Sequence, residues 1–491
     1  TAENQIYLSY VSSDCDGKSL RPSILIGKIK KMYPKLQEKS DVIYKEYKVE
    51  NKISTYEQLI ENISRLRNKE KIDDVWYYIY QYYKSQSDWN KKLEADLKGL
   101  EYTNLPEKIK KENLEKLYGN TLSTSISRLE KYRSCPFSYY LQYGLKLKEK
   151  EQLKIQSFNT GSFMHETIDE FFEYVRQEGL SLAELEEEQI TKIVFEIIEN
   201  NLKMSKNYIF TATAKYKVLV RRLKKIVSKA LKYIIETIIY SDFSIEGTEV
   251  EFGKNGRYKP IVLEIGEGKK VEITGKIDRI DTSKNEDGKY LRIIDYKSSA
   301  KNIDLNEVYA GLQIQLLTYT DAICREEDIM PAGVFYFSLL EQMVKADKKM
   351  TEDEIEETIR KNFKMKGLII ADVKIIKMND NTLKTGNSKL VPAALTTSGT
   401  INEKWTNGVK AEEFRTLQEY IYKTIKDISK EILSGNIDLK PYYKKGKTPC
   451  QYCEYKSVCG FNSRQENNTY NYIEQKSKDE ILLKMKKNLE E

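Results

Sequence analysis

The sequence lacks several features that would each assign it to a defined class of protein. No apolar run approaches the roughly 18 to 20 residues of a membrane-spanning helix, and the N-terminal TAENQIYLSY lacks the charged and then apolar pattern of a signal peptide. The triplet Gly17–Ser19 reads G-K-S, but Ser12 stands where a Walker A loop requires its first glycine. We therefore exclude a Walker A motif and expect a soluble, cytoplasmic protein without membrane association.

Histidine and cysteine are both scarce. Histidine occurs once in 491 residues, as His165, which is either a buried core residue or a metal ligand. The six cysteines are unevenly spread, three isolated and three close together in a C-x2-C-x5-C pattern: Cys15, Cys135, Cys324, Cys450, Cys453 and Cys459. Clustered cysteines in a reducing compartment favour metal binding over disulfides.

The charge of the chain is too small to indicate a ligand by itself. A formal net charge of +7 is modest for this length, and 40% hydrophobic residues are enough for true cores despite 32% charged residues. Many of the 36 tyrosines stand beside lysines and could stack on nucleic-acid bases. The codon bias of an AT-rich genome is the simpler explanation of that composition.

The first 120 residues read as mainly helical. IYLSYV (Ile6–Val11) has the pattern of a buried strand, a helix begins near Pro22, and the aromatic stripe Trp76–Tyr83 indicates core packing. The strand has no preceding partner, and the sequence starts with Thr1 rather than Met. We therefore expect a fragment of a longer protein, with one domain over residues 1–120 and another over 121–491.

The second domain is organised around a β-hairpin in VEITGKIDRIDTSKNEDGKYLRIIDYKSS, Val271–Ser299. The turn-forming run Ser283–Gly288 separates two β-patterned segments, of which the first is expected to end at Asp278 and the second at Asp295. Side chains at i and i+2 share one face of a strand, so Asp295 and Lys297 point into one site while Tyr296 turns away and leaves its carbonyl available. Carboxylates suit Mg²⁺ or Mn²⁺, and a nearby ammonium can hold the attacking water.

Segments on both sides of the hairpin complete an α/β pattern. A helix in GSFMHETIDEFFEYV places His165 and Asp169 one turn apart, and a helix starting at Ser125 or Ser127 is interrupted at Cys135 and Pro136. The other expected elements are a basic amphipathic helix over 215–240, a strand over 248–252, a helix over 307–325, a strand over 332–340, an irregular insertion over 341–400 and a helix over 411–433. The basic helix is either a solvated face or the lining of a phosphate-tracking channel.

Six motifs, in this order, resemble one family. They are CPF at Cys135, G-x3-H at Gly161–His165, GKIDRID, IIDYKSS, Q-x3-Y at Gln315–Tyr319 and the closing C-x2-C-x5-C. The combination resembles the RecB-like PD-(D/E)XK nucleases, and most closely the nuclease domain of the AddB-type subunits of AddAB helicase-nucleases. The resemblance runs from about Leu122 to Phe461. It implies a restriction-endonuclease-like α/β core with flanking helices, preceded by a mainly helical remnant of a helicase region.

The resemblance also implies a role for each site residue. His165, Asp278 and Asp295 would ligate Mg²⁺, with Mn²⁺ possible, and the Tyr296 carbonyl would complete the shell. Lys297 would position the water, while Gln315 and Tyr319 would hold the scissile strand and order the lysine. Glu249 and Glu251, on the preceding strand, rank below these residues as further ligands.

The same resemblance implies a [4Fe-4S] cluster on Cys135, Cys450, Cys453 and Cys459. Four thiolates suit zinc as well, and their spacing does not separate the two. Either group would staple the two ends of the domain and close a long loop, which is a structural role. Cys15 and Cys324 are expected to be ordinary thiols.

The function that these features imply is metal-dependent exonuclease cleavage of single-stranded DNA, in double-strand break resection and recombinational repair. The implied partner is an AddA-like helicase-nuclease subunit, in a heterodimer. One alternative is a catalytically silent DNA-binding scaffold that keeps the fold and the cluster. Another is a free-standing nuclease stapled by zinc.

Overall fold

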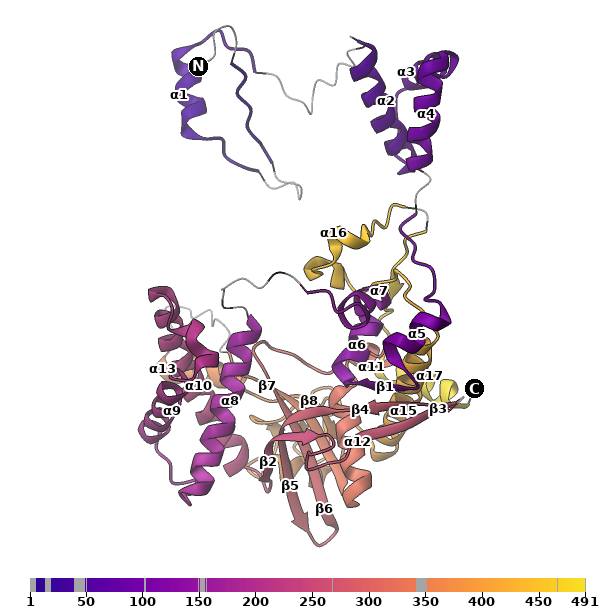
Figure 1. Cartoon of the computed structure of the whole chain (residues 1–491). Coiled ribbons are helices and arrows are strands. Elements are labelled where there is room, and N and C mark those ends of the chain that lie inside the picture. Colours follow the sequence, from indigo (N-terminus) through magenta and orange to yellow (C-terminus); the bar gives the residue numbers. More distant parts are fainter. Residues whose placement is uncertain are drawn as a thin grey trace. The chain divides into compact units, whose positions relative to one another are not determined.

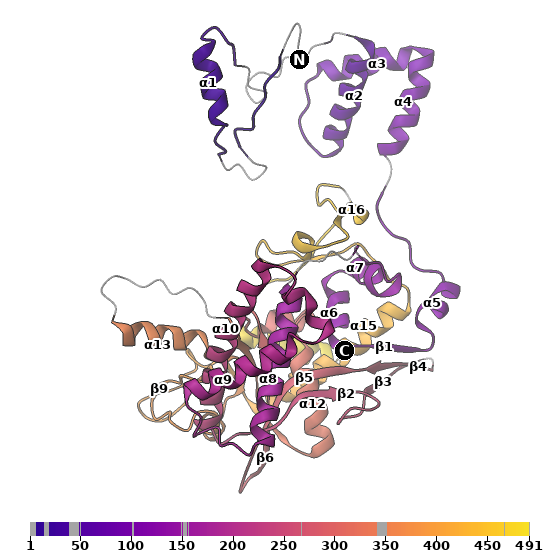
Figure 2. The same cartoon turned by 60° about the vertical axis from the view of Figure 1, so that its left-hand side comes forward.

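The chain divides into two compact units, Thr1–Tyr102 and Thr103–Glu491. The computed structural model (Figures 1 and 2) describes residues 6–13, 19–38, 49, 51–100, 103–148, 150, 155, 157–266, 268–340, 351–465 and 467–490. Cys15 and most of the G-K-S triplet lie outside these residues. The domain boundary expected at residue 120 falls inside the second unit, between α5 (Lys111–Tyr118) and β1 (Thr121–Thr124).

The first unit is helical. Its helices are α1 (Ile24–Met32), α2 (Lys52–Arg67), α3 (Val75–Ser85) and α4 (Ser87–Leu100). The side chain of Asn51 caps α2 by accepting the N–H groups of Ile53 and Ser54. The predicted core packing of the aromatic stripe Trp76–Tyr83 is confirmed in part. Trp76 and Tyr83 are buried in the core of this unit. Other tyrosines of the stripe, such as Tyr78, are exposed.

The prediction of a β-strand at Ile6–Val11 is wrong. These residues form no strand in the described part of the chain, and their side chains are exposed, Tyr7 to 87%. A β-pattern needs a neighbouring strand to complete its hydrogen bonds, and the pattern alone does not supply one.

A six-stranded mixed sheet forms the centre of the second unit. In spatial order its strands are β11 (Gly408–Val409), β8 (Lys366–Ile370), β7 (Met330–Ser338), β6 (Gly288–Lys297), β5 (Gly275–Asn285) and β2 (Ser244–Phe252). The predicted hairpin is confirmed as the antiparallel pair β5 and β6, with the register Arg279 to Ile294. Its first strand continues past Asp278 to Asn285, and the turn is correspondingly shorter than the expected Ser283–Gly288.

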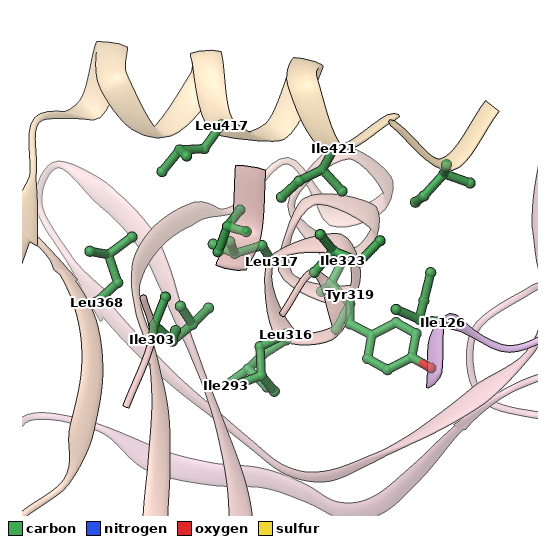
Figure 3. Close-up of a cluster of buried hydrophobic side chains, with 14 of the residues drawn as sticks. Ile126, Ile293, Ile303, Leu316, Leu317, Tyr319, Ile323, Leu368, Leu417 and Ile421 are labelled. Carbon is green, nitrogen blue, oxygen red and sulfur yellow. The ribbon is translucent and has the colours of Figure 1, made fainter. Parts of the chain in front are cut away.

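Helices cover both faces of this sheet, which confirms the α/β class (Figures 1 and 2). One layer consists of α8 (Ser157–Gln177), α9 (Glu187–Asn201) and α10 (Ala214–Ile239), which share a core with Ile294 and Tyr296 of β6. The other layer includes α6 (Ile126–Ser134), α12 (Gln315–Glu327) and α15 (Ala411–Leu433), packed on Ile293. Figure 3 shows this second core, with Leu317 and Tyr319 of α12 beneath Ile421 of α15.

Smaller elements complete the second unit. A three-stranded sheet has the order β1, β4 (Lys269–Ile273) and β3 (Ile261–Gly266), with β1 parallel to β4. The remaining helices are α7 (Pro136–Tyr139), α11 (Leu305–Tyr309), α13 (Glu352–Asn362), α14 (Val373–Asn379), α16 (Lys456–Cys459) and α17 (Lys478–Glu490). The remaining strands are β9 (Gly386–Asn387), β10 (Ala394–Leu395), β12 (Tyr442–Tyr443) and β13 (Asn471–Tyr472).

Two expected elements differ from those observed. The single helix over 307–325 is broken into α11 and α12, because Gly311 has φ +78°, a left-handed conformation that interrupts the helix. The irregular insertion expected over 341–400 is not observed in its described part, residues 351–400, which contributes β8 to the central sheet as well as α13 and α14. By contrast, the helix over 411–433 is confirmed as α15.

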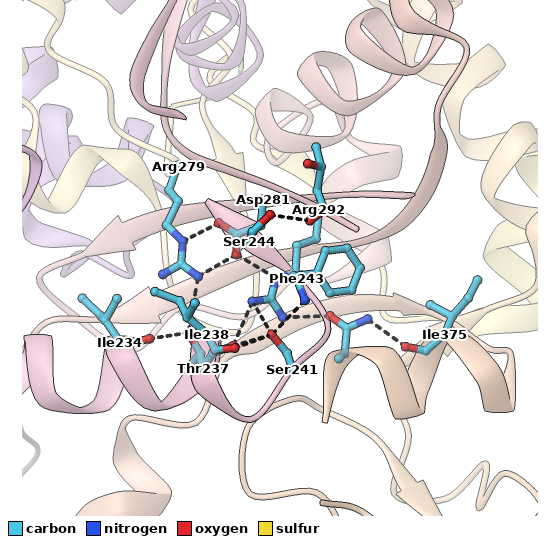
Figure 4. A network of polar contacts seen from close by, with 12 residues as sticks. Ile234, Thr237, Ile238, Ser241, Phe243, Ser244, Arg279, Asp281, Arg292 and Ile375 are labelled. Atoms are coloured by element: carbon cyan, nitrogen blue, oxygen red, sulfur yellow. Dashed lines mark hydrogen bonds and ion pairs between the residues drawn. The ribbon is translucent and has the colours of Figure 1, made fainter. Parts of the chain in front are cut away.

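A buried ionic network fastens the hairpin to the first helical layer (Figure 4). Asp281 of β5 accepts two hydrogen bonds from Arg279, both 2.6 Å, and one of 2.8 Å from Arg292 of β6. Arg292 also donates to the carbonyl of Thr237 in α10 at 2.9 Å. Breaking such a network would leave uncompensated buried charge, so it fixes the hairpin against α10.

The helices of the described residues include none that combines the length and the apolar character needed to cross a membrane.

Candidate active site

The hairpin brings the three central charged residues of the predicted site together. The backbone N–H of Tyr296 donates to Asp278 Oδ2 at 2.7 Å, so Asp278 of β5 is fixed against β6. Lys297 Nζ lies 2.5 Å from Asp295 Oδ2, as the alternation of a strand predicts for residues two apart. The Asp295 carboxylate is buried, whereas the Lys297 side chain keeps 32% of its surface exposed.

His165 and Glu249 reach the same place from other elements. His165 Nδ1, on α8, lies 3.4 Å from Asp278 Oδ2 and 3.9 Å from Glu249 Oε1 on β2. Among the described residues, these three form the one group of histidine, cysteine or acidic side chains whose ligand atoms all lie within 4.8 Å of one another. One imidazole nitrogen and two carboxylates are a donor set that fits a hard divalent cation.

Glu249 holds an unusual backbone conformation at this site. Its φ is +48°, which is uncommon for a residue with a side chain, and such outliers gather at functional sites. Beside it, Thr248 donates a hydrogen bond to Asp169 of α8, which fastens β2 to the helix that carries His165. Glu251, two residues further along, is exposed and pairs in register with Lys276. The sequence ranks Glu249 and Glu251 together as further metal ligands, but the structure brings only Glu249 near His165.

The charges of the site perturb one another. Burial, together with the charge of Asp278, raises the pKa of Asp295 to about 6. Burial lowers the pKa of His165, but Asp278, Asp295 and Glu249 together raise it more, so the net shift is upward. Burial raises the pKa of Glu249 as well. For Lys297, burial is outweighed by Asp295, Asp278 and Glu130 together, so its pKa is raised and its ammonium form is favoured. Perturbed pKa values of this kind cluster at functional sites.

The two residues of Q-x3-Y occupy different environments. Gln315 begins α12 and is partly buried, whereas Tyr319 is only 2% exposed. The Tyr319 ring stacks on Phe252 with a centroid distance of 5.1 Å and an interplanar angle of 14°. A Cβ placed on Gly275 would lie 1.8 Å from the Tyr319 hydroxyl oxygen, so this glycine is required for the close approach. Tyr319 therefore joins α12 to the start of β5 through packing.

The four cysteines of the predicted cluster line one cavity. Cys135 lies between α6 and α7, as the predicted interruption of that helix requires, while Cys450, Cys453 and Cys459 come from the region around α16. The walls between them are largely apolar and include Phe137, Leu439, Pro441, Pro449, Tyr455 and Phe461. Burial raises the pKa of the Cys135 thiol to about 11, so without a bound cation the neutral thiol is favoured. Cys324 lies elsewhere, on α12.

Two comparisons with known families match separate parts of the chain. Residues 123–460 match the PD-(D/E)XK nuclease superfamily. Residues 46–99 match the fifth domain of the ATP-dependent helicase/deoxyribonuclease AddB. The first match contains the five elements that carry the candidate site, α8, β2, β5, β6 and α12, and the second covers α2, α3 and all but the last residue of α4.

Curated relatives, each named as a subunit of an ATP-dependent helicase/deoxyribonuclease, are similar over the whole chain. The protein of Clostridium novyi (strain NT) is 37% identical over 503 residues, which cover 100% of this chain and 44% of that relative. That of Acetivibrio thermocellus is 36% identical with the same coverage, and that of Clostridium perfringens (strain SM101 / Type A) is 36% identical over 98% of this chain and 43% of its own. The chain thus spans less than half the length of these relatives.

Proposed function

The chain belongs to the PD-(D/E)XK nuclease superfamily, and from this we propose that it is a metal-dependent deoxyribonuclease that cuts single-stranded DNA. The observation that supports this most directly is the convergence of His165, Glu249 and Asp278 within 4.8 Å of one another, beside the Asp295 and Lys297 pair. The proposal extends to exonuclease action in an AddAB-type complex that resects double-strand breaks for recombinational repair.

Each residue of the site has a proposed part in hydrolysis. His165, Asp278 and Glu249 would hold Mg²⁺ or Mn²⁺, with Asp295 and the Tyr296 carbonyl as further oxygen donors. When bound there, the cation would supply Lewis acidity toward the phosphoryl oxygen and the attacking water. Lys297, held as an ammonium by Asp295, donates a hydrogen bond that orients the attacking water. Gln315, at the start of α12, holds the scissile strand.

We also propose that the cysteine cavity holds a [4Fe-4S] cluster. Cys135, Cys450, Cys453 and Cys459 line this one cavity together, which supports a single group held by four thiolates. The apolar walls of the cavity would keep water away from the cluster. Its role would be to join Cys135 to the segment around α16.

The test of the nuclease proposal is cleavage of end-labelled single-stranded DNA by the full 491-residue chain, with Mg²⁺ and with EDTA. We expect metal-dependent cutting by the wild type, and a loss of at least about 100-fold in Asp295→Ala and Lys297→Ala. Glu249→Gln should weaken Mn²⁺ binding measured by calorimetry. Glu251→Gln is the matched control, because it removes an exposed carboxylate from the same strand and should change neither measurement.

The outcomes separate this function from a DNA-binding scaffold. Cutting that is lost in the Asp295 variant and retained in the Glu251 variant would support the nuclease. Absence of cutting by the wild type, with DNA binding intact, would instead support the scaffold. Labels at the 5′ and the 3′ end in separate reactions would give the polarity of cleavage.

An AddA-like helicase-nuclease subunit is the proposed partner, in a heterodimer. The curated relatives are named as subunits of a helicase/deoxyribonuclease, and α2 to α4 match a domain of that protein. Co-purification of the chain with such a subunit would support this pairing. A chain that elutes as a monomer in the presence of the AddA-like protein would argue against it.

A further inference from the structure

Glu130 of α6 lies at the start of a helix that is distant in sequence. Its carboxylate oxygen Oε1 accepts the backbone N–H of Ile314 at 2.8 Å and that of Gln315 at 3.1 Å. These N–H groups belong to the first turn of α12, where a helix has no internal acceptors to offer. Ile314, the N-cap of α12, has no side chain that could do this itself. Glu130 therefore caps α12 from another element.

The capping carboxylate also lies within electrostatic range of two lysines, one of which belongs to the candidate active site. The positive charges of Lys301 and Lys297 both act on Glu130 and favour its ionised form. In turn, the negative charge of Glu130 contributes to the raised pKa of Lys297. Burial nevertheless dominates and raises the pKa of Glu130 to about 7. One carboxylate thus accepts the backbone N–H of Gln315 and acts electrostatically on the ammonium of Lys297.

The helix that carries Glu130 leads directly into the cysteine cavity. α6 ends at Ser134, and Cys135 follows as its C-cap. A second connection reaches the same region from the other cysteine segment, because Lys444 lies 2.6 Å from Asp304 Oδ2, just before α11. Gly311, between α11 and α12, packs on the side chain of Arg133 in α6. The segments that lead to the cysteines therefore contact α11 and the connection between α11 and α12.

We propose that Glu130 is a positioning residue of the nuclease site, which sets the start of α12, and with it Gln315, relative to Lys297. The proposal rests on the nuclease function proposed above. Glu130 does not touch the reacting atoms. It transmits the position of α6, fixed near Cys135, to the residues that hold the substrate strand and the water. None of the sequence motifs includes it.

Two variants of the full chain test this role. Glu130→Ala removes the oxygen that accepts both N–H groups, whereas Glu130→Gln keeps an oxygen that can accept them. Hydrogen–deuterium exchange should show amides at the start of α12 exchanging at least about tenfold faster in the alanine variant and within about threefold of wild type in the glutamine variant. The kcat for single-stranded DNA should fall at least about tenfold in the alanine variant only, with KM changed less than about threefold.

The matched control is Asp372→Ala. Asp372 also caps a helix through its carboxylate, as the N-cap of α14, and accepts the N–H groups of Lys374 at 2.8 Å and Ile375 at 3.2 Å. This variant should loosen α14 alone and leave cleavage unchanged, which separates a general loss of stability from misplacement of α12.

Either the exchange measurement or the cleavage measurement can refute the proposal. Unchanged exchange at the start of α12 in Glu130→Ala, or equal damage in the glutamine and alanine variants, would refute it. Loosened α12 with wild-type kcat would refute it as well. If the wild type itself cuts no DNA, the nuclease function has failed, and exchange at α12 still decides whether Glu130 holds that helix.

Discussion

Replacing Gly275 by alanine should misplace α12 without touching any charged residue of the site. An ideal Cβ at this position would lie 1.8 Å from the hydroxyl oxygen of Tyr319 and 2.7 Å from its Cζ, whereas ordinary contacts begin at 3.4 Å. Tyr319 has no free space into which it can turn, because it is 2% exposed and stacked on Phe252. The tyrosine and its helix must therefore shift by about 1.6 Å, the difference between these distances.

The expected cost follows from this overlap. Overpacking of a core by a methyl-sized group destabilises by about 1–3 kcal/mol. For a unit of about 390 residues this corresponds to a decrease in melting temperature of about 1–4 °C, given an unfolding entropy of about 2.1 cal/mol/K per residue. The rate of DNA cleavage should fall by a larger factor than the stability, because misplacement of a substrate-holding residue by about 1 Å can lower the rate about 100-fold. Gly275→Ala should thus remain folded and lose most of its activity.

The assay pairs calorimetry with cleavage of single-stranded DNA, and Gly253→Ala is the control. Gly253 follows Phe252, the register partner of Gly275, and a Cβ there would meet nothing within 4 Å. Replacing Tyr319 by leucine in the Gly275→Ala background removes the hydroxyl and the ring, and should restore part of the stability. A Gly275→Ala variant with wild-type melting temperature and cleavage would refute the reasoning.

Three further predictions concern other parts of the second unit. Asp281→Asn should destabilise by about 3–5 kcal/mol in urea unfolding, because two buried guanidinium groups lose their partner, and an unchanged midpoint would contradict this. The pKa of Glu130 is about 7 in the folded protein and 4.5 when unperturbed, so deprotonation of Glu130 should make the folded protein less stable as pH rises from about 5 to 7. The melting temperature of Glu130→Gln should lack this pH-dependent decrease. Identical pH profiles of melting temperature for the wild type and the variant would contradict the prediction. Cys453→Ser should abolish the visible absorbance of the proposed cluster and lower the melting temperature, whereas Cys324→Ser should preserve both.

The sequence alone determined those features that depend on local pattern. The hairpin was predictable because a turn-rich run separates two β-patterned segments, and strand alternation placed Asp295 beside Lys297. The amphipathic pattern over 411–433 matched α15 because its apolar stripe is continuous over 23 residues. The motifs also indicated the superfamily, since their residue types and order are visible without a structure.

The sequence pattern gave wrong predictions where a strand depends on a neighbouring strand that is distant in sequence. Ile6–Val11 has a β-pattern, but it forms no strand among the described residues. The sequence beyond residue 341 looked irregular, although it contains β8, which lies between β11 and β7 in the central sheet. Strand formation requires hydrogen-bonding neighbours, and these are chosen by tertiary packing.

Only the tertiary structure distinguished between chemically equivalent residues. Glu249 and Glu251 are alike in sequence, but the positive φ of Glu249 and its position opposite His165 place one in the site and leave the other exposed. Glu130 carries no local signal, because its partners Ile314 and Gln315 lie 184 and 185 residues away. Hydrogen bonds and charges act over ångströms in space, so their partners are decided by the fold, whereas the sequence supplies the residue types that the fold can bring together.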